Sequence, residues 1–324
     1  MPNRLIRNTA ILAINEATYS VDAGPTGAAN ALAVSNLSIN PINAKWVARD
    51  LIRPYLGASE ELQGESYVEM GFDIELVGSG SAGTATAWSP VLQSAGFAET
   101  LTAAVRADYT PISVGMKSCT LYWYDDGVLH KARGARSAAT LKAGMGTIPK
   151  MGFKFIGLYS TPTAASLPTI DISAFKQPQV VRDGNSQPLF FGGTHALATA
   201  PLLAGGTSYP SQGLELDFGL SNQFTALLGG ESVDITDRQM SGKVTLDLAA
   251  AQEVSFAAAV QAGTLSSLGL QHGTVVGNKV LIWAPSVQMK NPQKVEVNGK
   301  RLVGYDLRVL PVTGNDELRI VTSF

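Results

Sequence analysis

The chain has 324 residues, 45% of them hydrophobic and 15% charged, so it can bury a substantial core, and disorder is excluded as its general state. Lys and Arg number 24 against 26 Asp and Glu, a formal net charge of -2, which excludes the basic field that sequence-independent nucleic-acid binding requires. The single cysteine, Cys119, cannot form an internal disulfide and is interpreted as a small buried side chain of a cytosolic protein.

The amino-terminal residues resemble a secretion signal only superficially, since Arg4 and Arg7 precede a short apolar run at 10–14. That run ends too early for the apolar core of a signal peptide. A second apolar stretch, 196–206, is short and interrupted by Pro201, so it does not predict a membrane-spanning helix. We expect a soluble protein without a membrane partner.

Period-two alternation is the strongest local pattern, and it is clearest at residues 68–76. One face of this predicted strand carries Val68, Met70, Phe72, Ile74 and Leu76. The other carries Glu69, Gly71, Asp73 and Glu75. Such alternation is typical of an antiparallel sheet with one packed and one solvated face.

Two helices are predicted, each after an alternating strand. In WSPVLQSAGF (88–97), Ser89 is the expected N-cap, Pro90 the first helical residue and Gly96 the stop. In AQEVSFAAAVQAG (251–263), the helix is expected to end at Gly263.

A hairpin is predicted within 118–135, where Asp125, Asp126 and Gly127 form the turn. A strand at 148–159 follows, and the Ser/Thr/Pro/Ala-rich stretch 160–169 is interpreted as linker. Residues 177–212 fit an inter-domain bridge, an outward loop or part of a second sandwich.

The order of these elements occurs twice, in 37–159 and again in 214–311. Each copy has a strand, a short helix ending in Ala-Gly, a hairpin and a closing strand with glycine followed by an aromatic residue. We therefore expect a mainly β protein with two tandem antiparallel β-sandwich or barrel domains, each with a short flanking helix. The expected boundaries are 1–165 for the first domain, 166–186 for a linker and 187–324 for the second domain.

One stretch mimics a cofactor motif, because Gly78, Gly80 and Gly83 satisfy G-x-G-x-x-G after a strand. A dinucleotide site needs those glycines to open a helix within a βαβ unit, with an acidic residue about 20 positions on. Here the helix begins only near Ser89, so a strand-to-helix loop is preferred. A nucleotide-dependent oxidoreductase remains an alternative through this loop alone.

Other chemistry is not indicated. The histidines His130, His195 and His272 lack metal-ligand spacing. The carboxylate pairs Asp125–Asp126 and Glu60–Glu61 are explained by a turn and a loop. We expect no catalytic residue, metal or cofactor, and a protein that is not an enzyme.

Longer phrases carry a family resemblance that spans almost the whole chain. They are ALAVSNLSINPINAKWVARDLIRPYLG, FDIELVGSGSAGTATAWSPVLQSAGF, YTPISVGMKSCTLYWYDDGVLHKARGARSAA, HGTVVGNKVLIWAPSVQMKNP and GYDLRVLPVTGNDELRI. Taken in this order, they resemble the major tail tube proteins of long-tailed, siphovirus-like bacteriophages.

The resemblance implies a structural virion protein that forms rings by joining inner sheets and stacks these rings into a hollow conduit for phage genomic DNA. Six such domains usually complete a ring, so two domains per chain imply a trimeric, pseudo-hexameric ring. The implied partners are further copies of itself, the tape measure protein, the tail terminator and distal tail proteins. The implied location is the virion tail, assembled in the host cytoplasm.

The resemblance also implies which residues face the lumen and which contact the next ring. Lumen candidates are Glu69, Asp73, Glu75, Thr245 and Asp247, since carboxylates and neutral polar groups repel passing phosphate; a merely solvated sheet face is the alternative. Two loops, 47–65 and 227–242, are expected to touch the next ring. Their charged candidates are Arg49, Asp50, Arg53, Glu60, Glu61, Glu231, Asp234, Asp237 and Arg238, which could equally serve only loop solubility.

The main alternative within the same fold is a baseplate protein, a capsid-decorating protein or a secretion-system tube. Two complete domain copies with little appendage favour the tail tube, because a receptor-binding module would normally add a repetitive or aromatic-rich tip.

Overall fold

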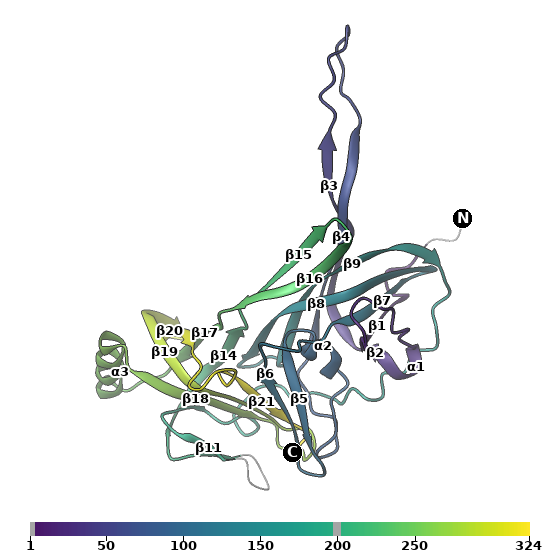
Figure 1. Cartoon of the computed structure of the whole chain (residues 1–324). Helices are drawn as coiled ribbons and strands as arrows, with labels where there is room; N and C mark the ends of the chain where they lie inside the picture. Colours follow the sequence, from purple (N-terminus) through teal and green to yellow (C-terminus); the bar gives the residue numbers. More distant parts are fainter. Residues whose placement is uncertain (1–3, 197–201) are drawn as a thin grey trace.

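The computed structural model describes residues 4–196 and 202–324, and in these residues the chain is mainly β and antiparallel (Figure 1). Seventeen strands belong to one extended sheet, and two further pairs of strands form separate hairpins. The mainly β, antiparallel fold predicted from the alternation is confirmed.

The strands up to residue 164 are β1 (Thr9–Asn15), β2 (Ala31–Leu32), β3 (Val34–Ala48), β4 (Glu61–Glu75), β5 (Phe97–Thr102), β6 (Arg106–Pro111), β7 (Cys119–Asp125), β8 (Val128–Gly144) and β9 (Lys150–Ala164). The later strands are β10 (Leu189–Phe191), β11 (Thr194–Ala196), β12 (Leu202–Ala204), β13 (Thr207–Tyr209), β14 (Ser211–Asp217), β15 (Leu220–Leu227), β16 (Gly230–Arg238), β17 (Ser241–Leu246), β18 (Leu265–His272), β19 (Val280–Val297), β20 (Lys300–Val309) and β21 (Arg319–Thr322). The helices are α1 (Gly27–Asn30), α2 (Ser89–Gln93) and α3 (Ala250–Ala262).

Eight strands form one continuous antiparallel layer in the order β3-β4-β9-β8-β14-β17-β20-β19. The first four come from the amino-terminal half and the last four from the carboxyl-terminal half. Each half uses its strands in the same order, because β14, β17, β20 and β19 repeat the places of β3, β4, β9 and β8. The pairing of β8 with β14 joins the halves.

A second layer is built from the other ends of β8 and β19. The start of β8 pairs with β7, which pairs with β1, and the start of β19 pairs with β18, which pairs with β10. The carboxyl-terminal strand β21 lies between β19 and β6, so this layer also joins the two halves. The result is a β-sandwich whose apolar core continues from one half into the other.

The alternation predicted for 68–76 is confirmed in β4. Val68, Met70, Phe72 and Ile74 are buried, and the residues between them are partly exposed. Phe72 stacks on Phe155, with 5.3 Å between ring centroids. Burying each such side chain stabilises the fold by about 2 kcal/mol, so the alternation fixes which face of the sheet is dry.

Both predicted helices are present, with one correction at the first. Helix α3 ends at Gly263, whose φ of 65° places it in the left-handed region, as predicted. At α2 the N-cap is Trp88 rather than Ser89, so the first helical residue is Ser89 and not Pro90. The Ser89 hydroxyl instead donates a hydrogen bond to Glu99 Oε1 at 2.6 Å, which takes it away from the helix amides.

The predicted hairpin is β7–β8, and its turn residues Asp126 and Gly127 both have positive φ. The predicted linker 160–169 is wrong in its first part. Strand β9 continues to Ala164, which lies opposite Val128 at the far end of β8. Strand β9 is this long because the start of β8 pairs with it. The Ser/Thr/Pro/Ala-rich composition of 160–164 gives no sign of this pairing.

The connection after β9 lies against both halves, and on the carboxyl-terminal side the Gln179 carbonyl is 3.1 Å from His272 Nε2. The Val181 N–H donates to Thr147 O at 2.9 Å, and the Gly146 N–H donates to Val181 O at 2.8 Å. Farther on, β10 and β13 join the sheet beside β18, so this part of 177–212 pairs with the carboxyl-terminal half. Residues 197–201 of that segment lie outside the described residues.

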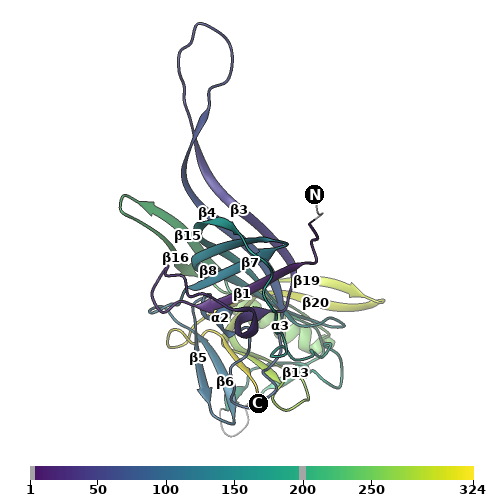
Figure 2. The ribbon, with the colours of Figure 1, turned by 90° about the vertical axis from the view of Figure 1, so that its right-hand side faces the viewer.

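Two hairpins project from the sandwich. The first arm, defined here as 41–68, is the outer part of β3 and β4 and ends in an open loop at 49–60 (Figure 2). The second arm, β15–β16, is a separate two-stranded sheet between β14 and β17. The predicted loop 47–65 is therefore shorter than expected, and the loop prediction for 227–242 is wrong, because most of that range is strand paired with β15.

Candidate assembly surface and polar sheet face

The eight-stranded layer carries a charged row on its polar face. Cross-strand partners on seven successive strands are all charged, in the order Glu75, Lys150, Lys142, Glu215, Lys243, Asp306 and Lys290. Every lysine in this row lies opposite at least one carboxylate. The row has four lysines and three carboxylates, so its net charge is only +1, because opposite charges on neighbouring strands largely compensate each other.

The five lumen candidates lie on this polar face or at its margin. Asp73 accepts a hydrogen bond from Asn36 Nδ2 at 2.6 Å and lies opposite Gly152. Thr245 holds the matching place opposite Gly304. Glu69 and Glu75 are on β4 with Asp73, while Asp247 follows β17 and lies 4.0 Å from Lys300 Nζ. The face that carries them also bears lysines, so it is mixed in charge rather than acidic or neutral.

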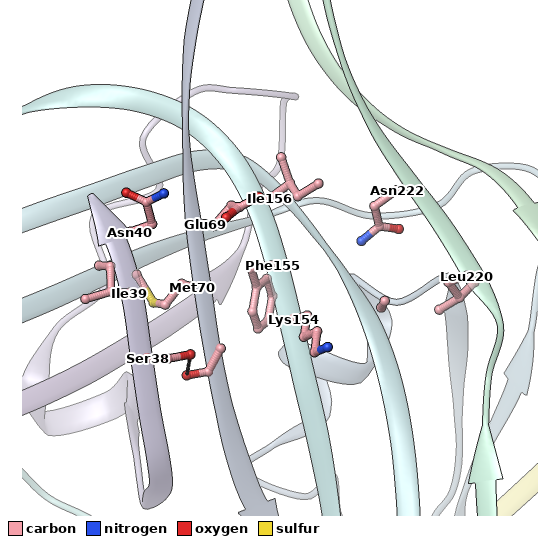
Figure 3. Close-up of a pocket in the computed structure, with 12 residues that line it drawn as sticks. Ser38, Ile39, Asn40, Glu69, Met70, Lys154, Phe155, Ile156, Leu220 and Asn222 are labelled. Carbon is pink, nitrogen blue, oxygen red and sulfur yellow. Dashed lines mark hydrogen bonds between the residues drawn. The ribbon is translucent and has the colours of Figure 1, made fainter. Parts of the chain in front are cut away.

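A groove of about 530 Å³ opens on the polar face of the first half, at the base of the second arm. Figure 3 shows Asn40 and Glu69 toward one side and Leu220 and Asn222 toward the other, with Lys154 between them. The groove forms because the second arm leaves the sheet after β14 and crosses over β8 and β9.

The second arm is held against the first half of its own chain. Asp234 Oδ1 is 2.6 Å from Arg136 Nη1, and the Tyr19 hydroxyl accepts a hydrogen bond from the Val233 N–H at 2.6 Å. At the outer end, the rings of Tyr67 and Phe224 are 5.0 Å apart. Asp234, nominated as an inter-ring residue, is thus already paired within the chain.

Arg238 is also engaged inside its own subunit. Its guanidinium is bonded to Glu317, and the two side chains are only 11% and 7% exposed. Arg238 Nη1 also donates to Ile112 O at 2.7 Å. Glu231 and Asp237, the other nominated residues of this arm, are exposed.

The first arm has a different surface from the one expected. Of its nominated charges, Arg49 pairs with Glu60 across the loop, Arg53 lies over the Tyr55 ring, and Asp50 and Glu61 are exposed. Its tip also carries an exposed apolar group, defined here as the apolar tip: Leu51, Ile52, Tyr55 and Leu56. Sequence reasoning missed these four, although LIRPYLG shows them within the charged stretch.

The layer has two unpaired edges. Within the described residues, β3 pairs along its length only with β4. At the opposite end, residues 289–297 of β19 pair only with β20. Unpaired strand edges present free N–H and C=O groups and readily accept another strand.

The glycine-rich loop 78–83 is an ordered contact between the halves. The Gly78 N–H donates to Asn278 Oδ1 at 2.7 Å, the Gly80 N–H to Gly277 O at 2.9 Å and the Gly83 N–H to Ser323 O at 2.9 Å. A side chain at Gly78 would come within 2.3 Å of Gly277 O. The amides that would bind a pyrophosphate are therefore already occupied by the second half.

The remaining chemical candidates have structural surroundings. His130 stacks on Trp123, His195 stacks on Trp283, and His272 is hydrogen-bonded to Ser186 and to the Gln179 carbonyl. Residues 4–196 and 202–324 hold no cluster of three metal-ligating side chains. Cys119 is fully buried on β7, as predicted, and burial raises the pKa of its thiol to about 12.

None of the helices in the described ranges has the length and apolarity needed to cross a membrane. A comparison with curated proteins gave no significant match. A family model described as phage tail tube protein matches residues 6–310, which is almost the whole chain and includes the eight-stranded layer and both arms. The chain therefore belongs to the phage tail tube protein family.

Proposed function

We propose that three copies of this chain close into a pseudo-hexameric ring and that the rings stack into the hollow tail tube. The observation that carries this proposal is the eight-stranded layer, in which four strands are repeated in the same order and both edges are unpaired. Joining the β19 edge of one copy to the β3 edge of the next satisfies both edges. Ring closure then leaves no edge open to uncontrolled association.

The size of such a ring suits its cargo. Three eight-stranded layers give a barrel of 24 strands, with a circumference of about 115 Å at about 4.8 Å per strand. The diameter is about 37 Å before strand tilt, which widens it. After about 5 Å of side chain at each wall, the bore still exceeds the width of a DNA double helix.

In this ring the polar face lines the lumen, and phage genomic DNA passes along it. The charged row supports rapid passage, because each of its four lysines lies opposite at least one of its three carboxylates, which leaves the row with a net charge of only +1. A wall of uncompensated lysines would exchange counterions with phosphate and retain the DNA. The mixed row should retain passing phosphate far less than such a wall would.

Ring stacking is assigned to the first arm. It projects away from the sandwich, and the side chains of its apolar tip are exposed. Arg53, Asp50 and Glu61 beside this tip would set the register between rings, because interfacial charges contribute specificity more than affinity. The second arm supports the wall from within its own subunit through Asp234.

The other partners follow from a place in the tail. The tape measure protein would occupy the lumen before DNA, and the terminator and distal tail proteins would meet the two ends of the tube. Assembly would take place in the host cytoplasm.

Negative-stain electron microscopy of the purified chain tests the proposal. Threefold rings or hollow rods are the expected particles. A uniform monomer at concentrations near 1 mg/ml, with or without salt or crowding agents, would contradict ring formation. Solid or single-start filaments would contradict the closed ring.

A further inference from the structure

The junction between β8 and β14 shows how one half of this chain joins the next. Its last four residue pairs are Ala143–Leu214, Lys142–Glu215, Leu141–Leu216 and Thr140–Asp217. In the ring proposed above, β19 and β3 of neighbouring copies occupy the same relative places as β8 and β14. The internal junction is therefore a template for the junction between copies.

Matched cross-strand pairs align the two halves residue by residue. Gly152 lies opposite Asp73 and Thr140, and Gly304 lies opposite Thr245 and Gln293. Both glycines sit in the third strand of their four-stranded set. Thr140 of β8 thus corresponds to Gln293 of β19.

The first strands of the two sets each carry an irregularity close to the matched residues of the second strands. Strand β3 has a register shift between Ser35 and Ser38, and β14 has one between Ser211 and Leu214. Each shift contains one residue with positive φ, Asn36 in β3 and Gly213 in β14. The pairings with the second strands fix the correspondence. Gly71 and Lys243 lie two residues before the matched Asp73 and Thr245. Gly71 lies opposite Ser38 and Lys243 lies opposite Glu215, so two residues on Asp217 of β14 corresponds to Asn40 of β3.

From this correspondence, and resting on the proposed ring, we infer the register of the contact between copies. Residues 293–296 of β19 in one copy pair antiparallel with residues 37–40 of β3 in the next. The pairs are Gln293–Asn40, Lys294–Ile39, Val295–Ser38 and Glu296–Leu37. The partner is thus a second copy of this chain, attached at one defined register.

Two prolines provide an independent observation. Pro41 follows Asn40 on β3, and Pro292 precedes Gln293 on β19, so both lie just beyond the same end of the inferred ladder. Proline has no N–H to donate and is confined to the margins of paired segments. The internal template also ends at the corresponding pair, Thr140–Asp217. A slip that moved either strand past this end would bring a proline into the ladder.

Disulfide trapping tests the register. Directly opposite residues of an antiparallel pair have Cα atoms about 4.5–5.5 Å apart, within reach of a disulfide, whereas diagonal residues are about 7–8 Å apart. Asn40 and Gln293 are both exposed, so each accepts cysteine without loss of core packing. The native Cys119 is fully buried and leaves the background low.

The experiment uses the full chain with Asn40→Cys and Gln293→Cys, assembled and then mildly oxidised. We expect most of the chain to migrate as covalent dimers and closed trimers on a non-reducing gel, and a mixture of the two single variants to give dimers only. The slipped pair Asn40→Cys with Val295→Cys is the matched control, expected to cross-link at least fivefold less.

The outcomes separate the register from the ring. Strong cross-linking of the slipped pair in normal tubes would overturn the register and leave the ring intact. Normal tubes in which neither pair cross-links would also overturn it. Absence of rings or tubes from the unsubstituted chain would instead contradict the proposed function.

Discussion

Gly213 of β14 lies directly opposite Gly144 of β8, at the first pair of the junction that joins the two halves into one layer. The backbone at Gly213 has a φ of +114°, and a Cβ there would lie 2.1 Å from Ala143 O. Only glycine fits, because a side chain would meet both a strained backbone and a fixed carbonyl of the neighbouring strand.

Replacing Gly213 with alanine should therefore open the junction. We expect Gly213→Ala to lower the free energy of unfolding by about 3 kcal/mol, since backbone strain and a steric clash add. Gly229→Ala is the control, because Gly229 has a φ of +95° but nothing within 4 Å of its missing Cβ, so its expected loss is about 1 kcal/mol. Urea unfolding of the unassembled subunit measures both; equal losses would show that the clash is relieved elsewhere.

The ion pair Arg238–Glu317 should contribute to the stability of the folded subunit more than to contacts between rings. Arg238→Met leaves the Glu317 carboxylate buried without its cation, which is expected to cost about 3–5 kcal/mol. Adding Glu317→Gln should recover at least half of that loss. Chemical denaturation of the single and double variants checks this.

An exposed ion pair on the first arm serves as the control for the Arg238–Glu317 prediction. Lys45 and Glu65 on the first arm are 3.9 Å apart, and the Lys45 side chain is 70% exposed. Lys45→Met should change stability by less than about 0.5 kcal/mol. A cost for Arg238→Met as small as this would mean that solvent reaches Glu317.

The apolar tip should control ring stacking. Ile52 and Leu56 are fully exposed, so the double change Ile52→Asp with Leu56→Asp should leave the thermal midpoint of the subunit unchanged within about 1 °C. Single rings should still form, while tube length in electron micrographs should fall at least tenfold, because each ring contact loses buried apolar area.

Two further variants test whether tube growth depends on the first arm: one changes a charge beside the apolar tip, and the other changes an exposed residue elsewhere. Arg53→Glu changes charge beside the tip and is expected to distort or block tube growth with the subunit still folded. Val114→Asp changes an exposed apolar residue outside the arm and should leave tube length unaltered. If the double variant Ile52→Asp with Leu56→Asp and the variant Arg53→Glu both formed tubes of normal length, the first arm would not be part of the stacking contact.

Acid should weaken the subunit partly through His195. Burial, together with the positive charges of Arg319 and Arg106, lowers the pKa of His195 to about 4, while in the unfolded chain it is about 6.5. As the pH falls below about 6.5 the unfolded chain takes up the proton first, so stability is complete above this pH and declines below it.

His195→Phe isolates this contribution. Phenylalanine can keep the stacking on Trp283 and cannot be protonated. Between pH 7 and pH 5 the unsubstituted chain should lose about 1 kcal/mol more stability than the variant, after allowance for solvent screening of a half-buried group. If the free energy of unfolding changed equally with pH in the two proteins, His195 would have the same pKa in the folded and the unfolded chain.

Sequence reasoning located the strands, helices and turns best where a local rule governs them. The period-two alternation of Phe72 and Ile74 identified the dry face of β4, and Gly263 was correctly predicted to end α3. It failed where a distant partner decides the outcome. Residues 230–238 form a strand because β15 pairs with them, although their own charges are typical of a loop.

The candidate surfaces also divide into features that the local sequence indicates and features that a distant partner decides. Charge alone drew attention to Asp234 and Arg238, which are in fact paired with Arg136 and Glu317 from distant parts of the chain. The signal for the apolar tip was present in the sequence, but no local pattern distinguishes an exposed leucine such as Leu56 from a buried one.

By itself, the sequence determined a mainly β fold, the face of each alternating strand that is buried and the family to which the chain is similar. Only the tertiary structure decided which strands are neighbours, that β8 meets β14 in one continuous layer, and that β3 and β19 remain as its edges. The physical reason is that alternation reports the two sides of a strand, whereas its lateral partners are chosen by backbone hydrogen bonds that any residue except proline can donate.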